Sequence, residues 1–276
     1  MICGRMKMRF LCSLFIAALL LTAAPASAQW LNYPTAGVPR TPSGAPNLNA
    51  PAPRTADGKP DLSGIWLPEE NRPCPPFNCD DMLTPQEFWD AGWGLKGGLP
   101  YQAWAADLVK KRGEAFGQGD PTAHCLPGGI MKLHSDPLLR KIVQVPGLLV
   151  ILNERNASYR QIFTDGRPLP EDPQPSFIGY SSGKWDGDTL VVETNGFRDG
   201  VWLDRKGSPL TEAGKITERF RRPSYGKLEV EFTVNDPKAY TAPWTIKLNQ
   251  RIKLDTELLD YICLENEKDV PHFVGK

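Results

Sequence analysis

The chain has 276 residues, of which 41% are hydrophobic and 23% are charged, and its 32 Lys and Arg balance its 32 Asp and Glu. Such a balance offers no basic footprint for nucleic acid and no polybasic segment for a membrane surface. The length fits one large domain, or one domain with an extension.

Residues 1–28 are predicted to be a secretory signal peptide. They contain the basic residues Arg5, Lys7 and Arg9, continue with the apolar run Phe10–Ala24 and end in Ala26-Ser27-Ala28, an A-x-A cleavage site. The apolar run is too short for a spanning helix, although an uncleaved N-terminal anchor is the alternative. Cleavage leaves 32 − 3 = 29 basic against 32 acidic residues, a net charge of −3. We therefore predict a periplasmic or secreted protein with no membrane span after cleavage.

Four cysteines follow the cleavage site, namely Cys74, Cys79, Cys125 and Cys263. An even number in an oxidising compartment predicts two disulfides, for which three connectivities exist. We favour a local Cys74–Cys79 link and a long-range Cys125–Cys263 link. A metal site built from these cysteines and His124 is the alternative, but export favours oxidation of the thiols. We therefore predict neither a metal nor a cofactor.

The N-terminal part of the mature chain divides into three segments. Residues 29–60 are rich in Pro, Ala, Gly and Thr and are predicted to be an extended linker. Residues 61–276 are predicted to form one domain, with its first strand over Asp61–Trp66. Within it, residues 80–118 are predicted to be a helical insertion, with short helices near 84–116. The sequence Thr84-Pro85-Gln86-Glu87 resembles a helix N-terminus, and aromatic residues follow it.

From Lys141 onward the pattern is typical of β-strands separated by Gly, Asp, Asn and Pro turns. Apolar residues alternate with polar ones most clearly in Leu228–Val234. Spacings near ten residues predict sequential antiparallel pairing. The expected strands are Lys141–Val145, Leu148–Glu154, Tyr159–Thr164, Phe177–Trp185, Thr189–Thr194, Lys215–Arg221, Lys227–Asn235, Thr241–Leu254 and Glu257–Cys263.

These strands predict a mainly β fold, an antiparallel meander β-barrel with a short helical insertion. Half-buried strands need closure to remove their edges. Eight or nine strands can close around side chains and a small ligand.

Two resemblances support this prediction. Gly64-Ile65-Trp66 resembles the G-x-W first strand of lipocalin-like (calycin) barrels. The segment Trp185–Thr194 and the closing Tyr261–Asn266 are similar to an exported bacterial family of unassigned function with W-x-G-D-T-L-V-V-E-T and Y-x-C-x-E-N motifs. The resemblance covers about residues 120–270, and it implies export and a Cys125–Cys263 disulfide. The family often carries a histidine where this chain has Ser208.

The catalytic candidates are a histidine and two carboxylates. His134 could act as a general base oriented by Asp136. Glu154 and Glu193 lie at the ends of apolar strands and, if they face inward, would have a raised pKa. Glu218 is a further strand carboxylate. No Gly-x-Ser-x-Gly motif is present, which disfavours a serine hydrolase. For each candidate, the alternative is an ordinary loop residue or an outward cross-strand pair.

The favoured function is an exported barrel that binds a small apolar or aromatic molecule, because eight tryptophans suit such a ligand. The alternatives are a cofactor-free lyase, isomerase or hydrolase, and a structural protein of the cell envelope. No nucleic-acid partner is expected. The predicted ligand-binding residues are Trp66, Trp185, Trp202, Tyr180, Arg160, Arg219, Tyr240 and Trp244.

Overall fold

The computed structural model describes residues 34–69 and 85–263. The predicted signal peptide and the Cys74–Cys79 link lie outside these residues. The elements are β1 (Gly64–Pro68), α2 (Gln86–Trp89), α3 (Ala103–Glu114), a 3-10 turn (Pro121–His124), α4 (Lys132–Ser135), β2 (Arg140–Val145), β3 (Leu148–Asn153), β4 (Ser158–Phe163), β5 (Tyr180–Asp186), β6 (Thr189–Asn195), β7 (Val201–Trp202), β8 (Pro209–Leu210), β9 (Lys215–Ser224), β10 (Lys227–Asn235), β11 (Trp244–Lys247) and β12 (Gln250–Ile252).

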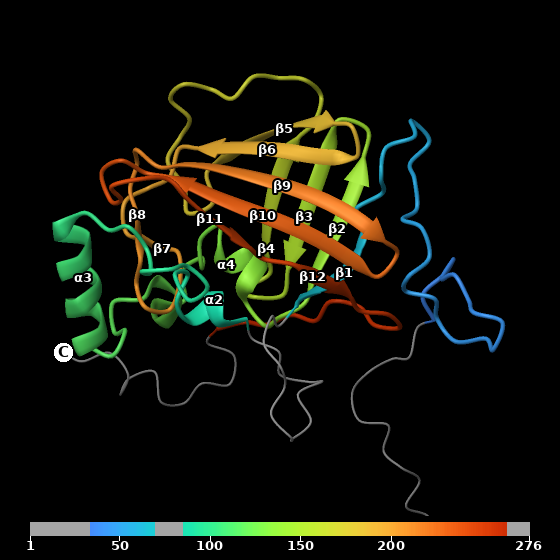
Figure 1. The fold of residues 1–276 in the computed structure, drawn as a ribbon, viewed down its shortest axis with the longest axis horizontal. Helices are drawn as coiled ribbons and strands as arrows, with labels where there is room; N and C mark the ends of the chain where they lie inside the picture. The colour runs from blue at the N-terminus through green and yellow to red at the C-terminus, as the bar shows by residue number, and fades with distance from the viewer. Residues whose placement is uncertain (1–33, 70–84, 264–276) are drawn as a thin grey trace, which may run out of the picture.

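Nine strands close into a barrel, which confirms the predicted fold (Figure 1). The ring runs β1-β2-β3-β4-β5-β6-β9-β10-β12 and returns to β1. Every junction is antiparallel except β4–β5, where Ile162 and Phe163 pair in parallel with Ser181 and Ser182. The barrel is therefore mixed, because the Pro-rich loop over residues 164–179 carries the chain back before β5 begins.

The predicted strands near the C-terminus need one refinement and one correction. The predicted strand Thr241–Leu254 is observed as β11 and β12, which keep one register against β10 on both sides of Leu248. The predicted strand Glu257–Cys263 is wrong, since this segment has only an isolated bridge from Tyr261 to Arg155. Its backbone instead bonds to the β3–β4 connection, where Asn156 N donates to Tyr261 O.

Alternation along the strands builds the core. In β9 and β10 every second residue is buried, including Ile216, Phe220, Val230 and Phe232, and polar residues occupy the positions between them. Side chains from the other strands complete one continuous apolar cluster. Its first-strand member is Trp66, fully buried, whose indole Nε1 donates to Leu62 O at 3.1 Å.

The helical insertion lies beside the barrel (Figure 1). Before α3, the backbone of Gln102 bonds to Ala239 O in the β10–β11 connection. On α3, Arg112 donates to Gly207 O at 2.6 Å, and its guanidinium stacks on the Trp202 ring. Of the aromatic residues in the insertion, Phe88 is buried, whereas Trp89, Trp93 and Trp104 are exposed.

The segment over residues 34–60, here called the arm, contains no helix or strand. Its first part forms a loop that projects away from the barrel, and the remainder runs along the side of the barrel (Figure 1). Its backbone bonds to the β9–β10 turn through Tyr225 N–Ala50 O and Gly226 N–Leu48 O. Arg54 pairs with Asp188 in the β5–β6 turn at 2.7 Å. The arm is thus held against the barrel at several points.

Candidate functional site

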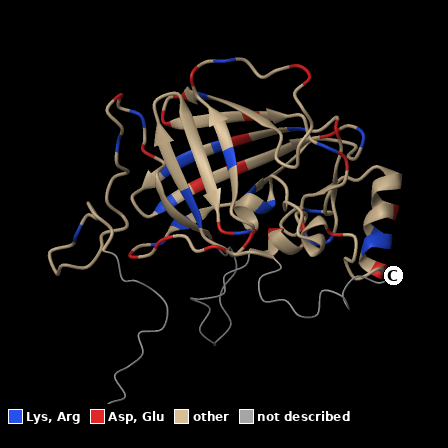
Figure 2. Ribbon diagram, turned by 180° about the vertical axis from the view of Figure 1, so that it is seen from behind, with Lys and Arg blue, Asp and Glu red and all other residues tan. Residues whose placement is uncertain are grey.

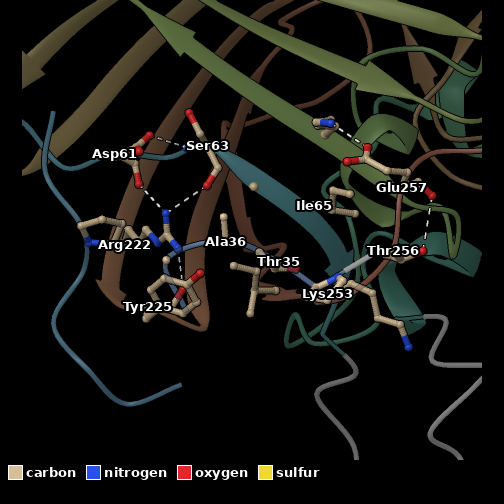
Figure 3. Close-up of a pocket in the computed structure, with 16 residues that line it drawn as sticks. Thr35, Ala36, Asp61, Ser63, Ile65, Arg222, Tyr225, Lys253, Thr256 and Glu257 are labelled. Carbon is tan, nitrogen blue, oxygen red and sulfur yellow. Dashed lines mark hydrogen bonds and ion pairs between the residues drawn. The ribbon is translucent and has the colours of Figure 1, made fainter. Parts of the chain in front are cut away.

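A pocket of about 420 Å³ lies between the arm and the outside of the barrel (Figure 3). One side is formed by the arm and another by the start of β1. The β9–β10 turn and the segment after β12 close the remainder. The lining residues are Pro34, Thr35, Ala36, Gly37, Pro53, Asp61, Ser63, Gly64, Ile65, Lys141, Arg222, Tyr225, Ile252, Lys253, Thr256 and Glu257.

Arg222 at the end of β9 fixes one wall of this pocket. Its guanidinium donates to Asp61 O, to Ser63 O at 3.0 Å and to Tyr225 O at 2.6 Å. It also lies 4.9 Å from the centre of the Trp66 ring. Burial lowers the pKa of Arg222 to about 10, and the nearby Asp61 only partly offsets this. Arg222 therefore joins the first strand to the β9–β10 turn and gives the pocket a rigid base.

The opposite wall is held by contacts between distant parts of the chain. Lys141 of β2 pairs with Glu257 at 2.7 Å. Thr35 N donates to Asp255 Oδ1 at 2.8 Å, and Asp255 N donates to Thr35 Oγ1 at the same distance. The arm and the C-terminal segment are thereby joined across the pocket. Opening it would break these exposed contacts and leave the barrel ladder intact.

The pocket combines an apolar lining with a polar rim. Ile65 and Ile252 are buried hydrophobic residues, and Tyr225 also lines the pocket. Thr35, Ser63 and Thr256 supply hydroxyl groups. Ligand sites commonly have this composition, and their volumes run from about 300 to 1,000 Å³.

A second polar centre lies inside the barrel. His134 of α4, Arg160 of β4 and Glu218 of β9 are each at most 2% exposed. His134 Nε2 lies 2.7 Å from Glu218 Oε1. Arg160 Nη1 donates to the same oxygen at 2.9 Å, and Nη2 bonds to Oε2. An ionised carboxylate only accepts, so Nε2 of His134 carries the proton.

Neighbouring hydroxyls complete this cluster. Arg160 Nη2 also donates to Ser181 Oγ at 3.0 Å and to Thr194 Oγ1 at 3.1 Å. Burial by itself raises the pKa of Glu218, but the charge of Arg160 and the hydrogen bond from His134 outweigh it and lower the pKa to about 2. Burial lowers the pKa of His134, and the bond to Glu218 offsets this only in part. The stable state is therefore an Arg160–Glu218 ion pair beside a neutral imidazole.

α4 is fixed in place by a second buried arginine. Arg140 of β2 donates to the carbonyl groups of His134, Asp136 and Leu138. It also donates to Gln250 Oε1 at 2.6 Å, and the Gln250 amide donates back to His134 O at 3.0 Å. These donors satisfy carbonyl groups at the end of a one-turn helix. The position of His134 therefore depends on β2 and β12 as well as on its own helix.

The structure separates the three predicted catalytic residues. His134 faces the barrel interior, but its carboxylate partner is Glu218 and not Asp136, which instead pairs with Arg155. Glu154 is buried, and its carboxylate accepts from Leu139 N at 3.1 Å and from Leu259 N at 2.9 Å. It therefore holds two chain segments together.

Glu193 faces outward, which is the alternative that the sequence left open for it. Glu193 is exposed, because Val192 and Thr194 on either side of it are the buried positions of β6. Apolar residues occupy both faces of this strand over Leu190–Val192, so the alternation was ambiguous there.

The predicted ligand-binding residues also do not meet at one place. Trp66, Trp202, Arg160, Tyr240 and Trp244 are buried. They contact other protein groups: Tyr240 Oη, for example, donates to Pro209 O at 2.8 Å.

Three further candidates lie away from the interior. Tyr180 and Trp185 are half-buried, and Tyr180 stacks on Phe163 with 5.2 Å between the ring centres. Arg219 is exposed and pairs with Asp186. Of the eight predicted residues, none lines the pocket.

Cys125 and Cys263 form a disulfide, with 5.5 Å between their Cα atoms and a sequence separation of 138. The bond joins the turn after the 3-10 helix to the last described residue. A disulfide is consistent with an oxidising compartment.

The alternation of the strands indicates that two buried polar residues, Glu218 and Gln250, face the core. Glu218 is in phase with Ile216 and Phe220, and Gln250 is in phase with Ile252. A polar residue in phase with apolar neighbours on a strand is expected to face the core. No comparable local pattern marks the pocket, because its lining comes from five separate segments.

Within the described ranges, no group of three or more His, Cys, Asp and Glu residues could hold a metal ion. In the same ranges, none of the helices is both long and apolar enough to cross a membrane. A scan against protein-family models found no match, and searches of curated proteins and of solved structures found none either. The resemblances noted from the sequence therefore stay predictions.

Proposed function

We propose that this chain is an exported β-barrel protein that binds a small apolar or aromatic molecule in the pocket between the arm and the barrel. The observation that carries the proposal is the pocket itself, with a volume of about 420 Å³, an apolar lining and a polar rim. Shape and burial by Ile65, Ile252 and Tyr225 would supply affinity, and the rim hydroxyls would orient the ligand.

This proposal moves the ligand from the barrel interior to its outer surface. The interior residues that could have lined a cavity are engaged with one another through hydrogen bonds and ring contacts. A ligand there would have to displace the Arg160–Glu218 ion pair. A ligand in the pocket displaces only solvent.

The enzyme alternative is less well supported. His134 and Glu218 have the geometry of a general base that is oriented by a carboxylate. However, both oxygens of this carboxylate already accept hydrogen bonds from Arg160 and His134, and Gln250 holds α4, which carries His134, in position. We assign this cluster to stability because the Glu218 carboxylate and the Arg160 guanidinium already have partners within the chain.

The proposal is tested by titrating the mature protein with a fluorescent neutral aromatic probe, 1-aminoanthracene, and then displacing the probe with a panel of small apolar metabolites. Ala36 is exposed and lines the pocket, so Ala36→Trp should fill it and weaken binding at least about tenfold. Ala56 is an exposed arm residue outside the pocket, and Ala56→Trp is the matched control. Absence of saturable binding, or equal affinities of the two variants, would refute the proposal.

A further inference from the structure

The outer wall of β2, β3 and β4 is apolar. These strands pair in register over their whole length, so their outward side chains form a three-by-three array. Seven of the nine positions are apolar, and three of these side chains are strongly exposed: Val143 at 37%, Val145 at 46% and Tyr159 at 61%. The apolar members, here called the apolar wall, are Val143, Val145, Leu148, Val150, Leu152, Tyr159 and Phe163, and the other two positions are Lys141 and Gln161.

The other side of the same barrel is built differently. The outward positions of β9 and β10 carry Lys, Arg, Glu and Thr, and Arg221 pairs across the strands with Glu229 at 2.6 Å. Figure 2 looks onto the apolar wall, where the strands are largely tan, with charged residues marked on strands behind them. Solvent-exposed antiparallel strands normally alternate apolar-in and polar-out. β9 and β10 follow this rule, whereas β2, β3 and β4 carry apolar residues on their outward face. An exposed apolar face of this kind indicates an interaction surface.

The margins of the apolar wall carry no net charge. Lys141 at one corner pairs with Glu257 at 2.7 Å. At the other end Arg167 lies over the Phe163 ring and pairs with Asp165 at 2.6 Å. Arg155 after β3 pairs with Asp136. Each of these three basic side chains is therefore matched by a carboxylate of the same chain. The complementary surface is neutral, apolar and flat.

We infer that the apolar wall is the contact surface for a second copy of this chain. A wall packed on its own copy about a two-fold axis is self-complementary, and it brings no like charges together because the marginal charges are already paired within each copy. Two twisted sheets facing each other pack about 10 Å apart with their strands about 30° from parallel. β3, the central strand of the wall, is paired with β2 and β4 over its whole length, so the copies meet through the face of these strands.

The dimensions indicate a reversible dimer. Three strands about 4.8 Å apart and six residues long at about 3.3 Å each cover roughly 290 Å² of sheet. That is the core of an interface, well below the roughly 800 Å² per partner of a stable complex. Val150 occupies the centre of the array, so a two-fold axis through the middle of the wall passes close to it.

The test is sedimentation equilibrium of the mature protein from about 10 µM to about 1 mM. The wild type should pass from monomer to dimer with rising concentration. Val145→Glu should weaken association at least about tenfold, since it buries a carboxylate at an apolar contact. Thr245 is an exposed outward residue of β11 on the opposite side, and Thr245→Glu, which makes the same change in charge, should leave association unchanged.

A cysteine at the centre of the wall gives an independent readout. Val150→Cys, oxidised with copper phenanthroline, should form a disulfide-linked dimer in which two thiols lose their hydrogens to the oxidant. A wild type that stays monomeric up to 1 mM would overturn the inference, as would a dimer weakened by Thr245→Glu and not by Val145→Glu. Sedimentation of a monomeric wild type with phosphatidylcholine vesicles, abolished by Val145→Glu, would assign the wall to a lipid surface instead.

Discussion

Glu218 balances the charge inside the barrel. It is the carboxylate that faces Arg160, and both side chains are at most 1% exposed. An ion pair of this kind contributes little compared with a well-packed apolar pair, but removal of one member leaves an uncompensated buried charge. We therefore expect substitutions within the cluster to lower the free energy of unfolding strongly. Substitution of an outward carboxylate on a neighbouring strand should change it little.

Glu218→Gln should lower the free energy of unfolding by about 3–5 kcal/mol, because Arg160 keeps its charge and loses its partner. Glu193→Gln, the same change at an exposed position on the adjacent strand β6, should stay within about 0.5 kcal/mol of the wild type. Urea unfolding measures both. Similar values for the two variants would contradict the assignment of the cluster to stability.

The same cluster predicts acid sensitivity. The pKa of Glu218 falls from 4.5 to about 2 on folding, so between these pH values the unfolded chain binds the proton and the folded chain does not. Its stabilisation, about 3 kcal/mol, is complete above pH 4.5 and is lost as the pH falls towards 2. The lowered pKa of His134 acts in the same direction below its ordinary value of 6.5, because protonation is favoured in the unfolded chain.

Urea unfolding from pH 7 to pH 2 measures this dependence, with Glu218→Gln as the comparison. The stability difference between wild type and variant should shrink as the pH falls from 4.5 to 2. A difference that stays constant over this range would show that Glu218 does not titrate as the geometry requires.

At the scale of elements, a one-turn helix owes its position to a strand residue. α4 has four residues, too few to be stable alone. Arg140 donates to the carbonyl groups of His134 in α4, of Asp136 directly after it and of Leu138 further on, and a planar guanidinium suits this task better than an ammonium group. Packing of the His134 ring on Phe220, 5.6 Å away, adds an apolar contact.

Arg140→Met should therefore destabilise the fold by about 2–4 kcal/mol and release α4 first, since the carbonyl groups lose their donors while the strand keeps its ladder. Hydrogen exchange at the amides of His134, Ser135 and Asp136 should accelerate more than exchange in β3. The neighbouring Lys141→Met removes an exposed ion pair and serves as the control, with an expected change below about 1 kcal/mol. Unchanged exchange in α4 of Arg140→Met would rule out this role.

The strands could be predicted where local signals agreed. Over Lys227–Asn235 strict alternation and flanking turns define the strand, and its predicted bounds match β10. The parallel β4–β5 junction could not be predicted, because it depends on the path of the loop between Thr164 and Gly179 and on no pattern within either strand. In Glu257–Cys263, apolar residues suggested a strand, but Glu154 and the disulfide hold this segment by individual contacts.

At the scale of the whole molecule, the barrel is assembled from residues far apart in sequence. β1 near the start of the domain closes the ring against β12 near its end. The pocket depends on the same closure, because its lining spans residues 34 to 257. Sequence patterns therefore predicted the barrel but not the pocket. Residues such as Arg222 and Lys141 line the pocket only when β1 has paired with β12 and the barrel is closed.

The Cys125–Cys263 disulfide is a further contact that holds the end of the domain, in addition to the pairing of β1 with β12. In the chain-entropy description, the Cys125–Cys263 link closes a loop of 138 residues and contributes about 5 kcal/mol, whereas a Cys74–Cys79 link would close a short loop and contribute about 2 kcal/mol. The double variant Cys125→Ser/Cys263→Ser should thus lose more stability than Cys74→Ser/Cys79→Ser. Urea unfolding under non-reducing conditions measures the losses, and peptide mapping establishes the links present in the wild type.

The two variants also differ in their expected effect on the pocket, because only the Cys125–Cys263 link anchors the segment that follows β12. Probe binding should therefore weaken in the first variant and persist in the second. The opposite order of stability would mean that β1–β12 pairing alone holds the ends of the domain together.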